Sequence, residues 1–405
     1  MAQNADHAVD QTVDQTVAQT AGRIKVLHLI TRLAVGGAQD NTLLTVENHD
    51  RTRFESHLAA NPDDAWLSRA QAAADQFHAL PNLVRPIHPL QDVRALLDIV
   101  ALLRREKFDV LHTHSSKAGI LGRIAGRLAG IPVVVHTIHG FPFHDFMSPL
   151  KRRFYILLER GLRAFADFYI TVCELNRNQA VELGLVQLAR SQTVYSGISF
   201  TKLDRPGNLA ATRCELEIPE DCQIIVMVGR LDQQKAPYYL IEAFAQVVKA
   251  CPNTLLLLVG EGELRSQLET QVQQLGVTEN VRFLGSREDV PEILKIADIF
   301  ALSSLWEGLG RAMTEAMLLG KPVVVPEIYG IPEIVHAHET GLLFPAGDTE
   351  QLAAHLANLL QHPEVREQLG TRAKALTRAR FDAKLMVKQI EEIYDKLLDL
   401  PTQLR

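Results

Sequence analysis

Arg230 and Lys235 are five residues apart in the loop Gly229–Lys235, which follows the predicted strand Gln223–Val228. Gly229 allows the backbone to turn sharply at the end of that strand. An arginine can bind a phosphate group with two parallel hydrogen bonds, and a lysine binds it as a point charge. This spacing therefore suits a phosphate-binding loop, although two ordinary charges on a solvated loop would give the same pattern.

A second group of polar residues follows another predicted strand, in the stretch SSLWEGLGRAMTEAMLLGK. Glu307 precedes the predicted helix Gly310–Leu319, and Glu315 lies inside it. The first N–H groups of a helix have no partner within the helix and can bind oxygen atoms of a ligand. A carboxylate can accept hydrogen bonds from two sugar hydroxyl groups. Because Glu315 stands in an apolar context and a buried carboxylate needs a partner, we favour a binding role over a capping role.

Glycine loops follow two further predicted strands. Gly260 follows the predicted strand Thr254–Val259, and Gly36 and Gly37 follow the first predicted strand of the chain. Such loops beside a helix start can admit a nucleotide, because helix N-termini favour anions. A simple tight turn explains each of these loops equally well.

His139 ends the segment IPVVVHTIHG and could donate a hydrogen bond or act as an acid or base. Other histidines lie near similar strand edges but not four residues apart on a predicted helix, so no metal site is expected among them. These are His112, His114, His136 and His144. No Asp-x-Asp follows a predicted strand. We therefore expect no metal and no cofactor, with Arg230 and Lys235 neutralising a bound diphosphate.

Two alternating series of strands and helices position these residues. The first series begins at Lys25–Thr31, and the second begins at Gln223–Val228 after a turn-rich stretch. Strand–helix alternation is typical of doubly wound sheets. The sequence thus predicts an α/β protein with two doubly wound Rossmann-like domains that face each other across a cleft.

The expected domain boundaries follow from composition. Residues 1–20, with the repeat VDQT, VDQT, VAQT, read as a disordered tail. Residues 21–200 form an N-terminal domain and residues 201–380 a C-terminal domain, for which the family resemblance given below implies acceptor-side and donor-binding roles. Residues 381–405 form a C-terminal helix that could pack back on the N-terminal domain.

Composition excludes several classes of protein. The chain has 405 residues, 47% of them hydrophobic, which fits a globular protein of two domains. No apolar run is long enough to span a bilayer, and the start lacks the features of a secretory signal. Four scattered cysteines indicate neither a zinc site nor a disulfide scaffold.

The net charge of −6 conceals an asymmetry, since residues 21–200 carry +5 and the residues after them −8. We expect a cytoplasmic protein without a nucleic-acid partner.

Together these segments resemble retaining glycosyltransferases of family 4, which have the GT-B fold, from about Lys25 onwards. GRLDQQK is similar to the phosphate loop of that family, and EGLGRAMTEAM to its element of two glutamates separated by seven residues. GIPEIV, ETGLLFPAGD and HTIHGF match further segments of the family. Several ordered matches at the right spacing are far more specific than any single one.

The resemblance implies roles for the residues named above. Arg230 and Lys235 would hold the diphosphate of a nucleotide-sugar donor, and Glu315 would accept hydrogen bonds from the ribose. The transferred sugar would be held by Glu307 and by the backbone amides of Leu309 and Gly310. His139 would lie near the reacting face of the sugar, and Gly36 and Gly37 would let their loop approach the donor. The catalytic set so implied is His139, Glu307, Arg230 and Lys235.

Four positions depart from the family pattern. Ala236-Pro237 follows the lysine where glycine is usual, and Leu309 stands where phenylalanine is common. Arg311 replaces an apolar residue, and Tyr329 stands where a second glycine is frequent. None of these removes a proposed contact, but Arg311 and Tyr329 leave the donor sugar open.

The expected function is a retaining hexosyl transfer from a UDP- or GDP-sugar to a saccharide or lipid-linked acceptor of the cell envelope. One alternative is a protein that binds a sugar nucleotide without catalysis. Another is an NAD-dependent oxidoreductase, although the loop at Gly36 lacks the G-x-G-x-x-G fingerprint.

A basic amphipathic helix is predicted at Ser148–Ala166. Between Lys151 and Arg163 it carries five basic residues against Glu159 alone. Such a helix can lie on an anionic membrane, which would place the protein at the inner face of the cytoplasmic membrane. A core helix with a solvated basic face is the alternative.

Overall fold

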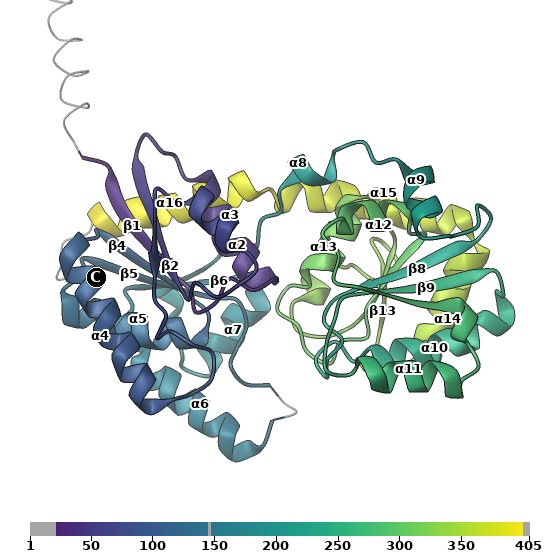
Figure 1. Cartoon of the computed structure of the whole chain (residues 1–405), viewed down its shortest axis with the longest axis horizontal. Helices are drawn as coiled ribbons and strands as arrows, with labels where there is room; N and C mark the ends of the chain where they lie inside the picture. Colours follow the sequence, from purple (N-terminus) through teal and green to yellow (C-terminus); the bar gives the residue numbers. More distant parts are fainter. Residues whose placement is uncertain (1–21, 145–146, 400–405) are drawn as a thin grey trace, which may run out of the picture. The chain divides into compact units, whose positions relative to one another are not determined.

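The computed structural model describes residues 22–144 and 147–399. It contains two parallel sheets, each flanked by helices (Figure 1). The α/β class with two doubly wound sheets is therefore confirmed. The tail predicted at residues 1–20 lies outside the described residues. None of the described helices is long and apolar enough to cross a membrane.

The first sheet has seven strands in the order β3-β2-β1-β4-β5-β6-β7, which is the order of a doubly wound dinucleotide-binding sheet with one added strand. Burial of its central strands on both faces explains their apolar, β-branched sequences. The strands are β1 (Ile24–Leu29), β2 (Phe54–Ala60), β3 (Gln76–Ala79), β4 (Val110–His114), β5 (Val133–Ile138), β6 (Phe168–Thr171) and β7 (Ser191–Thr193).

Six α-helices connect these strands, and local signals set their ends. Pro89 begins α4, where a missing N–H costs nothing, and Lys107 ends it in a left-handed conformation. The helices are α2 (Gly37–Asn48), α3 (Leu67–Ala73), α4 (Pro89–Glu106), α5 (Ser116–Ala129), α6 (Pro149–Leu162) and α7 (Glu174–Glu182), with short 3-10 turns at η1 (Arg163–Phe165) and η2 (Leu188–Arg190).

The second sheet has six strands in the order β10-β9-β8-β11-β12-β13, and every neighbouring pair is parallel. Its centre is the pair β8–β9, which is aligned from Gln223 opposite Thr254 to Val228 opposite Val259. The strands are β8 (Gln223–Val228), β9 (Thr254–Val259), β10 (Val281–Gly285), β11 (Ile299–Ala301), β12 (Val323–Pro326) and β13 (Leu342–Phe344).

Helices that follow these strands bury apolar faces against the second sheet. They are α10 (Pro237–Ala250), α11 (Arg265–Gln274), α12 (Val290–Ile296), α13 (Arg311–Leu318) and α14 (Thr349–Gln361). The remaining helices and turns are α8 (Phe200–Leu203), α9 (Leu209–Glu215), α15 (Pro363–Arg380), α16 (Ala383–Asp399), η3 (Thr278–Asn280) and η4 (Ile331–Glu333).

The last turns of α16 pack on the first sheet. The carboxylate of Glu391 accepts hydrogen bonds from His49 Nδ1 and from the backbone N–H of Asp50, both at 2.9 Å. Tyr394 is fully buried, and Arg53 forms an ion pair with Asp395 at 2.6 Å. These last turns of α16 are thus part of the core that covers β1.

Candidate functional site

Three loops meet at the carboxyl end of the second sheet, where the neighbouring strands β9, β8 and β11 end. Backbone hydrogen bonds join the loops. Leu231 N–H donates to Glu261 O at 3.0 Å, and Leu305 N–H donates to Gln234 O at 2.8 Å. The topology of the sheet therefore brings residues 229–236, 260–263 and 302–310 together, although they are far apart in the chain.

Lys235 and Glu307 form an ion pair inside this group of loops, between Nζ and Oε1. Both side chains are largely buried, with exposed fractions of 16% and 6%. Ser304 Oγ donates to the same carboxylate oxygen at 2.6 Å, and Ser303 Oγ donates to the backbone oxygen of Ala236 at 2.9 Å. The pair is thus positioned by the loops on both sides of it, and an ammonium and a carboxylate face the same small volume.

Arg230 occupies a more open position in the same loop. Its guanidinium forms an ion pair with Asp232 at 3.0 Å and donates to Gln234 Oε1 at 2.8 Å. Its side chain is 55% exposed. The arginine can therefore exchange these contacts for a bound anion more readily than the buried lysine can.

Gly229 and Gly260 allow the backbones of two loops to touch. Gly260 has φ +137°, and a Cβ atom there would lie 2.0 Å from the backbone oxygen of Gly229. The N–H of Gly229 donates to Val259 O at 2.9 Å. Only glycine fits at residue 260, so the close approach of these loops depends on it.

The N-terminal end of α13 borders the same loops. Gly310 precedes the helix in a left-handed conformation at φ +77°, and Leu309 before it is buried. Glu315, on the second turn of α13, is half-buried and accepts a hydrogen bond from Arg311 Nε at 3.1 Å. Arg311 is thus a partner of the predicted ribose-binding carboxylate, and the positive end of the helix dipole favours an anion beside it.

The remaining predicted residues, His139, Gly36 and Gly37, lie in connections of the first sheet. His139 directly follows β5. Desolvation by burial lowers the pKa of its imidazole to about 4, so the ring is neutral at neutral pH. Gly36 and Gly37 begin α2, which follows β1. The structure therefore places His139 after the carboxyl end of β5, and Gly36 and Gly37 in the connection that follows β1, with β4 between these two strands. Ligands of doubly wound sheets bind at this end of the strands.

The sequence pattern does not identify the side chains that hold this site in place. Asp232 and Gln234 bind Arg230, and Ser304 binds Glu307. Only their position in the loops after β8 and β11 could have indicated a role for these three side chains. Their hydrogen bonds depend on how loops from different strands meet, which the sequence does not give.

The arrangement can stabilise a diphosphate leaving group and orient a polyhydroxylated substrate. Lys235 and Arg230 provide positive charge, the end of α13 provides N–H groups, and Glu307 and Glu315 provide acceptors for hydroxyl groups. These features define a nucleotide-sugar-dependent transferase with the GT-B fold.

Comparison with known proteins agrees with this class. Residues 36–196 match the model of the glycosyl transferase 4-like domain, and residues 210–376 match that of the glycosyl transferases group 1. The chain belongs to the group 1 family of retaining glycosyltransferases, also called family 4. It is accordingly an enzyme, and the alternatives of a non-catalytic binding protein and an oxidoreductase are set aside.

Two relatives illustrate the chemistry of the family. The UDP-Gal:alpha-D-GlcNAc-diphosphoundecaprenol alpha-1,3-galactosyltransferase of Escherichia coli is 30% identical over 386 residues, which cover 93% of this chain and 97% of that protein. The capsular polysaccharide biosynthesis glycosyltransferase CapM of Staphylococcus aureus is 23% identical and is covered to 85% of its length.

Solved structures confirm the fold. The crystal structure of Anabaena HepE in complex with UDP-glucose superimposes with a TM-score of 0.81 at 23% sequence identity. The match covers 92% of this chain and all of that one. The structure of WaaG, a glycosyltransferase involved in lipopolysaccharide biosynthesis, has a TM-score of 0.74 at 18% identity.

Proposed function

We propose that this enzyme transfers a hexose from a UDP-sugar to a saccharide carried on a lipid diphosphate, with retention of the anomeric configuration. The observation that carries the proposal is the ion pair of Lys235 with Glu307, positioned by Ser304 at the end of α13. The E. coli relative uses UDP-Gal and a diphosphoundecaprenol acceptor, and HepE binds UDP-glucose, which supports the choice of nucleotide and acceptor.

In this mechanism the bond between the anomeric carbon and the β-phosphate oxygen breaks, and its electron pair leaves with UDP. The acceptor hydroxyl forms the new bond on the same face, and its proton passes to an oxygen of the departing phosphate. Arg230 and Lys235 stabilise the charge that grows on the diphosphate. Glu307 exchanges part of its contact with Lys235 for hydroxyl groups of the sugar, and Glu315 binds the ribose.

The proposal requires no metal at the donor site. Two cations, Arg230 and Lys235, together with the N-terminal end of α13, provide the positive charge that a diphosphate needs. His139 would act as a neutral hydrogen-bonding group near the sugar. Gly36 and Gly37 would let the start of α2 approach the donor.

A panel of nucleotide sugars tests the donor. Binding to the folded state raises the unfolding temperature by mass action, so UDP-hexoses should raise it and GDP-hexoses should not. The best donor is then incubated with lipid diphosphate saccharides, and the products are analysed by mass spectrometry and by NMR of the anomeric proton. A stabilising GDP-sugar would overturn the choice of nucleotide, and an inverted linkage would overturn the retaining mechanism.

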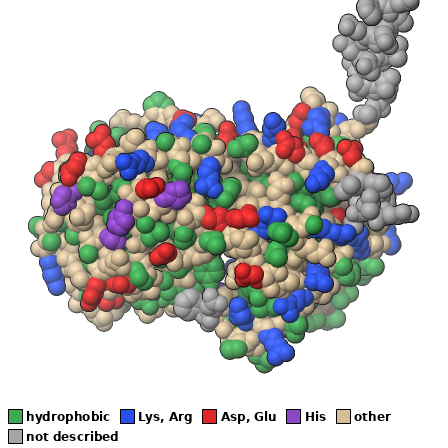
Figure 2. Space-filling model, turned by 180° about the vertical axis from the view of Figure 1, so that it is seen from behind, with side chains coloured by type: hydrophobic (Ala, Val, Ile, Leu, Met, Phe, Trp, Pro, Cys, Tyr) green, Lys and Arg blue, Asp and Glu red, His purple; other side chains and the backbone are tan. Residues whose placement is uncertain are grey.

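An exposed apolar and basic surface on α6 supports a lipid-linked acceptor. Leu150, Phe154 and Leu157, spaced along one face of the helix, are 80%, 59% and 54% exposed. Lys and Arg side chains lie beside hydrophobic ones on this part of the molecule (Figure 2). A groove along the helix is lined by Arg152, Arg153 and Arg160. Exposed apolar side chains beside cations suit the interface of an anionic bilayer.

We therefore propose that α6 binds the anionic inner face of the cytoplasmic membrane. Replacing Lys151 and Arg153 with glutamate should abolish sedimentation with vesicles that contain phosphatidylglycerol. The matched control replaces the exposed Arg372 and Lys374 of α15 with glutamate, which changes the net charge equally. Equal losses in both variants would show a general charge effect. Unchanged binding by the α6 variant would contradict the proposal.

A further inference from the structure

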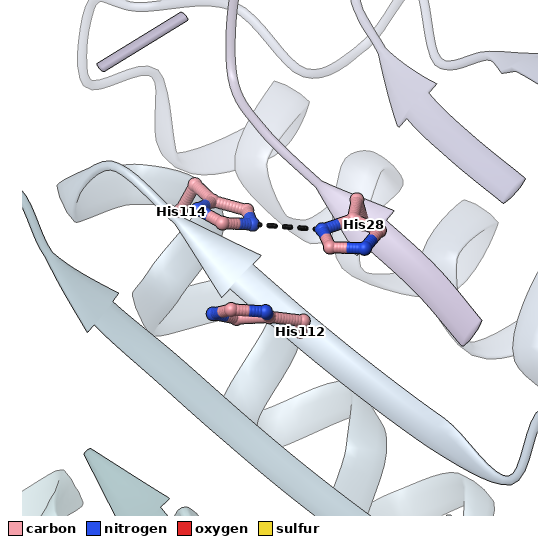
Figure 3. Close-up of side chains that lie close together, drawn as sticks. All are labelled: His28, His112 and His114. Carbon is pink, nitrogen blue, oxygen red and sulfur yellow. Dashed lines mark hydrogen bonds between the residues drawn. The ribbon is translucent and has the colours of Figure 1, made fainter. Parts of the chain in front are cut away.

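Three histidines gather on one face of the first sheet. His28 lies on β1, and His112 and His114 lie on the neighbouring strand β4. His28 is directly opposite His112 in the register of these strands. Side chains two residues apart on a strand point to the same face, so His114 joins the pair (Figure 3).

The imidazole nitrogens are close enough to share one ion. His28 Nδ1 and His114 Nε2 are 3.0 Å apart, and one ligand atom from each of the three side chains lies within 4.8 Å of the others. The ring centroids of His112 and His114 are 4.2 Å apart, and the ring planes are tilted by 32° to each other. A separation of 3.0 Å is close to that of two nitrogens on a tetrahedral zinc ion, whose Zn–N bonds measure about 2.0–2.1 Å.

Neighbouring side chains orient these rings as the outer partners of metal-binding histidines do. His28 Nε2 is hydrogen-bonded to His49 Nε2 at 3.0 Å, and His49 Nδ1 donates to the carboxylate of Glu391 at 2.9 Å. A carboxylate only accepts, so His49 Nε2 is the acceptor and His28 Nε2–H the donor. The unprotonated nitrogen of His28 is then Nδ1, which faces His114.

Tyr394 orients the ring of His112 through a hydrogen bond. Its Nδ1 is hydrogen-bonded to the hydroxyl group of Tyr394 at 2.5 Å. Glu391 and Tyr394 both come from α16, so one helix orients two of the three rings. A hydrogen bond to one ring nitrogen fixes the orientation and tautomer of a metal-binding histidine.

We propose that His28, His112 and His114 bind a divalent transition-metal ion of the kind that prefers imidazole, such as Zn²⁺. A water molecule would complete a tetrahedral shell. The carboxylate of Glu391, linked through His49, would offset part of the positive charge. Because all three side chains are fully buried, the ion would enter while the domain folds. The site would link β1 and β4 to the covering helix α16.

A second histidine pair of the same sheet provides the control. His57 Nδ1 and His78 Nε2 are 2.9 Å apart, both rings are buried, and His57 Nε2 is bound to Glu55 at 2.8 Å. This pair resembles the proposed site in burial and hydrogen bonding but consists of two imidazoles. His78→Gln should therefore leave metal content unchanged, whereas His112→Gln should remove the metal.

The test measures metal in untagged protein produced in medium supplemented with zinc. Wild type and His78→Gln should contain about one zinc per chain, and His112→Gln should fall about tenfold. Cobalt-substituted wild type should show the visible absorption bands of tetrahedral Co²⁺, and His112→Gln should lack them. Wild type without zinc or these bands, or equal zinc in His112→Gln, would overturn the proposal.

If His112→Gln does not fold, the identity of the ligand atoms around the zinc in the wild-type protein tests the proposed site instead. X-ray absorption of the zinc-loaded wild type should then show a shell dominated by imidazole nitrogen. A shell that contains sulfur, or oxygen without imidazole, would place the zinc elsewhere and overturn the proposal. Circular dichroism of each variant confirms that its fold is retained before metal content is compared.

Discussion

Lys235 and Glu307, which are 72 residues apart in the chain, form an ion pair at the carboxyl ends of the neighbouring strands β8 and β11. The resemblance assigns the lysine to the diphosphate and the glutamate to the sugar. These two groups of a donor are joined by the bond that breaks. Under the proposed function, the ion pair holds, before the donor arrives, the two side chains that would act on either side of that bond.

Removal of the lysine should reduce transfer more than removal of the arginine. We expect Lys235→Ala to lower kcat/KM by about 10²- to 10³-fold, as does loss of one group that stabilises transition-state charge. Arg230→Ala should have a smaller effect, because the arginine is more exposed and solvent screens its charge. Initial rates with a UDP-sugar measure both.

Lys249→Ala is the matched control, since this exposed lysine ends α10 away from the three loops. It should retain wild-type kcat/KM. Near-normal turnover by Lys235→Ala in a folded protein would contradict the proposed role of the lysine. The same rates measured with Lys235→Arg show whether charge alone is sufficient.

Glu315 should distinguish ribose from deoxyribose. A hydrogen bond to a charged group contributes about 1.5–3 kcal/mol, so Glu315→Ala should weaken UDP binding by about 10- to 100-fold. Binding of 2′-deoxy-UDP should weaken much less, because one of the hydroxyl groups is already missing. Isothermal titration calorimetry with both nucleotides measures the difference. Equal losses for the two nucleotides would show that Glu315 does not bind the ribose through its 2′-hydroxyl group.

Two controls separate binding from helix stability. Arg311→Ala removes the partner of Glu315 on α13 but leaves the carboxylate, so UDP binding should weaken less than in Glu315→Ala. Glu350→Ala, at an exposed position in the first turn of α14, should bind both nucleotides as wild type does.

Gly260→Ala should destabilise the second sheet. The new Cβ atom would lie 2.0 Å from the backbone oxygen of Gly229, at φ +137°. Backbone strain alone costs about 1–3 kcal/mol, and the clash adds to it, so the unfolding temperature should fall. Gly276→Ala is the comparison, since that residue has φ +70° and no atom within 4 Å of an added Cβ. If both variants lower the unfolding temperature equally, the close approach of the loops at Gly229 and Gly260 does not contribute to the stability of the fold.

The sequence predicted the second sheet more completely than the first. The predicted strands at Gln223–Val228 and Thr254–Val259 match β8 and β9 residue for residue, because both are continuous apolar runs bounded by turn residues. The sequence pattern predicts no element in residues 50–107, where the structure has β2, α3, β3 and α4. β3 is short and partly exposed at the sheet edge, which leaves no clear apolar signal.

The sequence likewise predicts some features of the candidate site and not others. Glycines, cations and glutamates in loops after strands are visible in the sequence, because loop position and residue type are local. The pairing of Lys235 with Glu307 depends on β8 lying beside β11, and the histidine cluster depends on β1 lying beside β4. In the sequence, His112 and His114 stand out only as histidines near a strand edge, and no pattern points to His28. Strand order and register bring such residues together, and one sequence does not show either.

His139 should influence the rate without titrating in the neutral range. Burial lowers the pKa of its imidazole to about 4, so the ring is uncharged above about pH 5. His139→Gln should therefore lower kcat by the same factor at every pH between about 5.5 and 8. The lowered pKa also means that the unfolded chain binds more protons than the folded one between about pH 6.5 and 4. Stability should thus fall as the pH falls through that range, and less steeply in His139→Gln. An acid limb near pH 6.5 in wild type that disappears in His139→Gln would contradict a neutral imidazole.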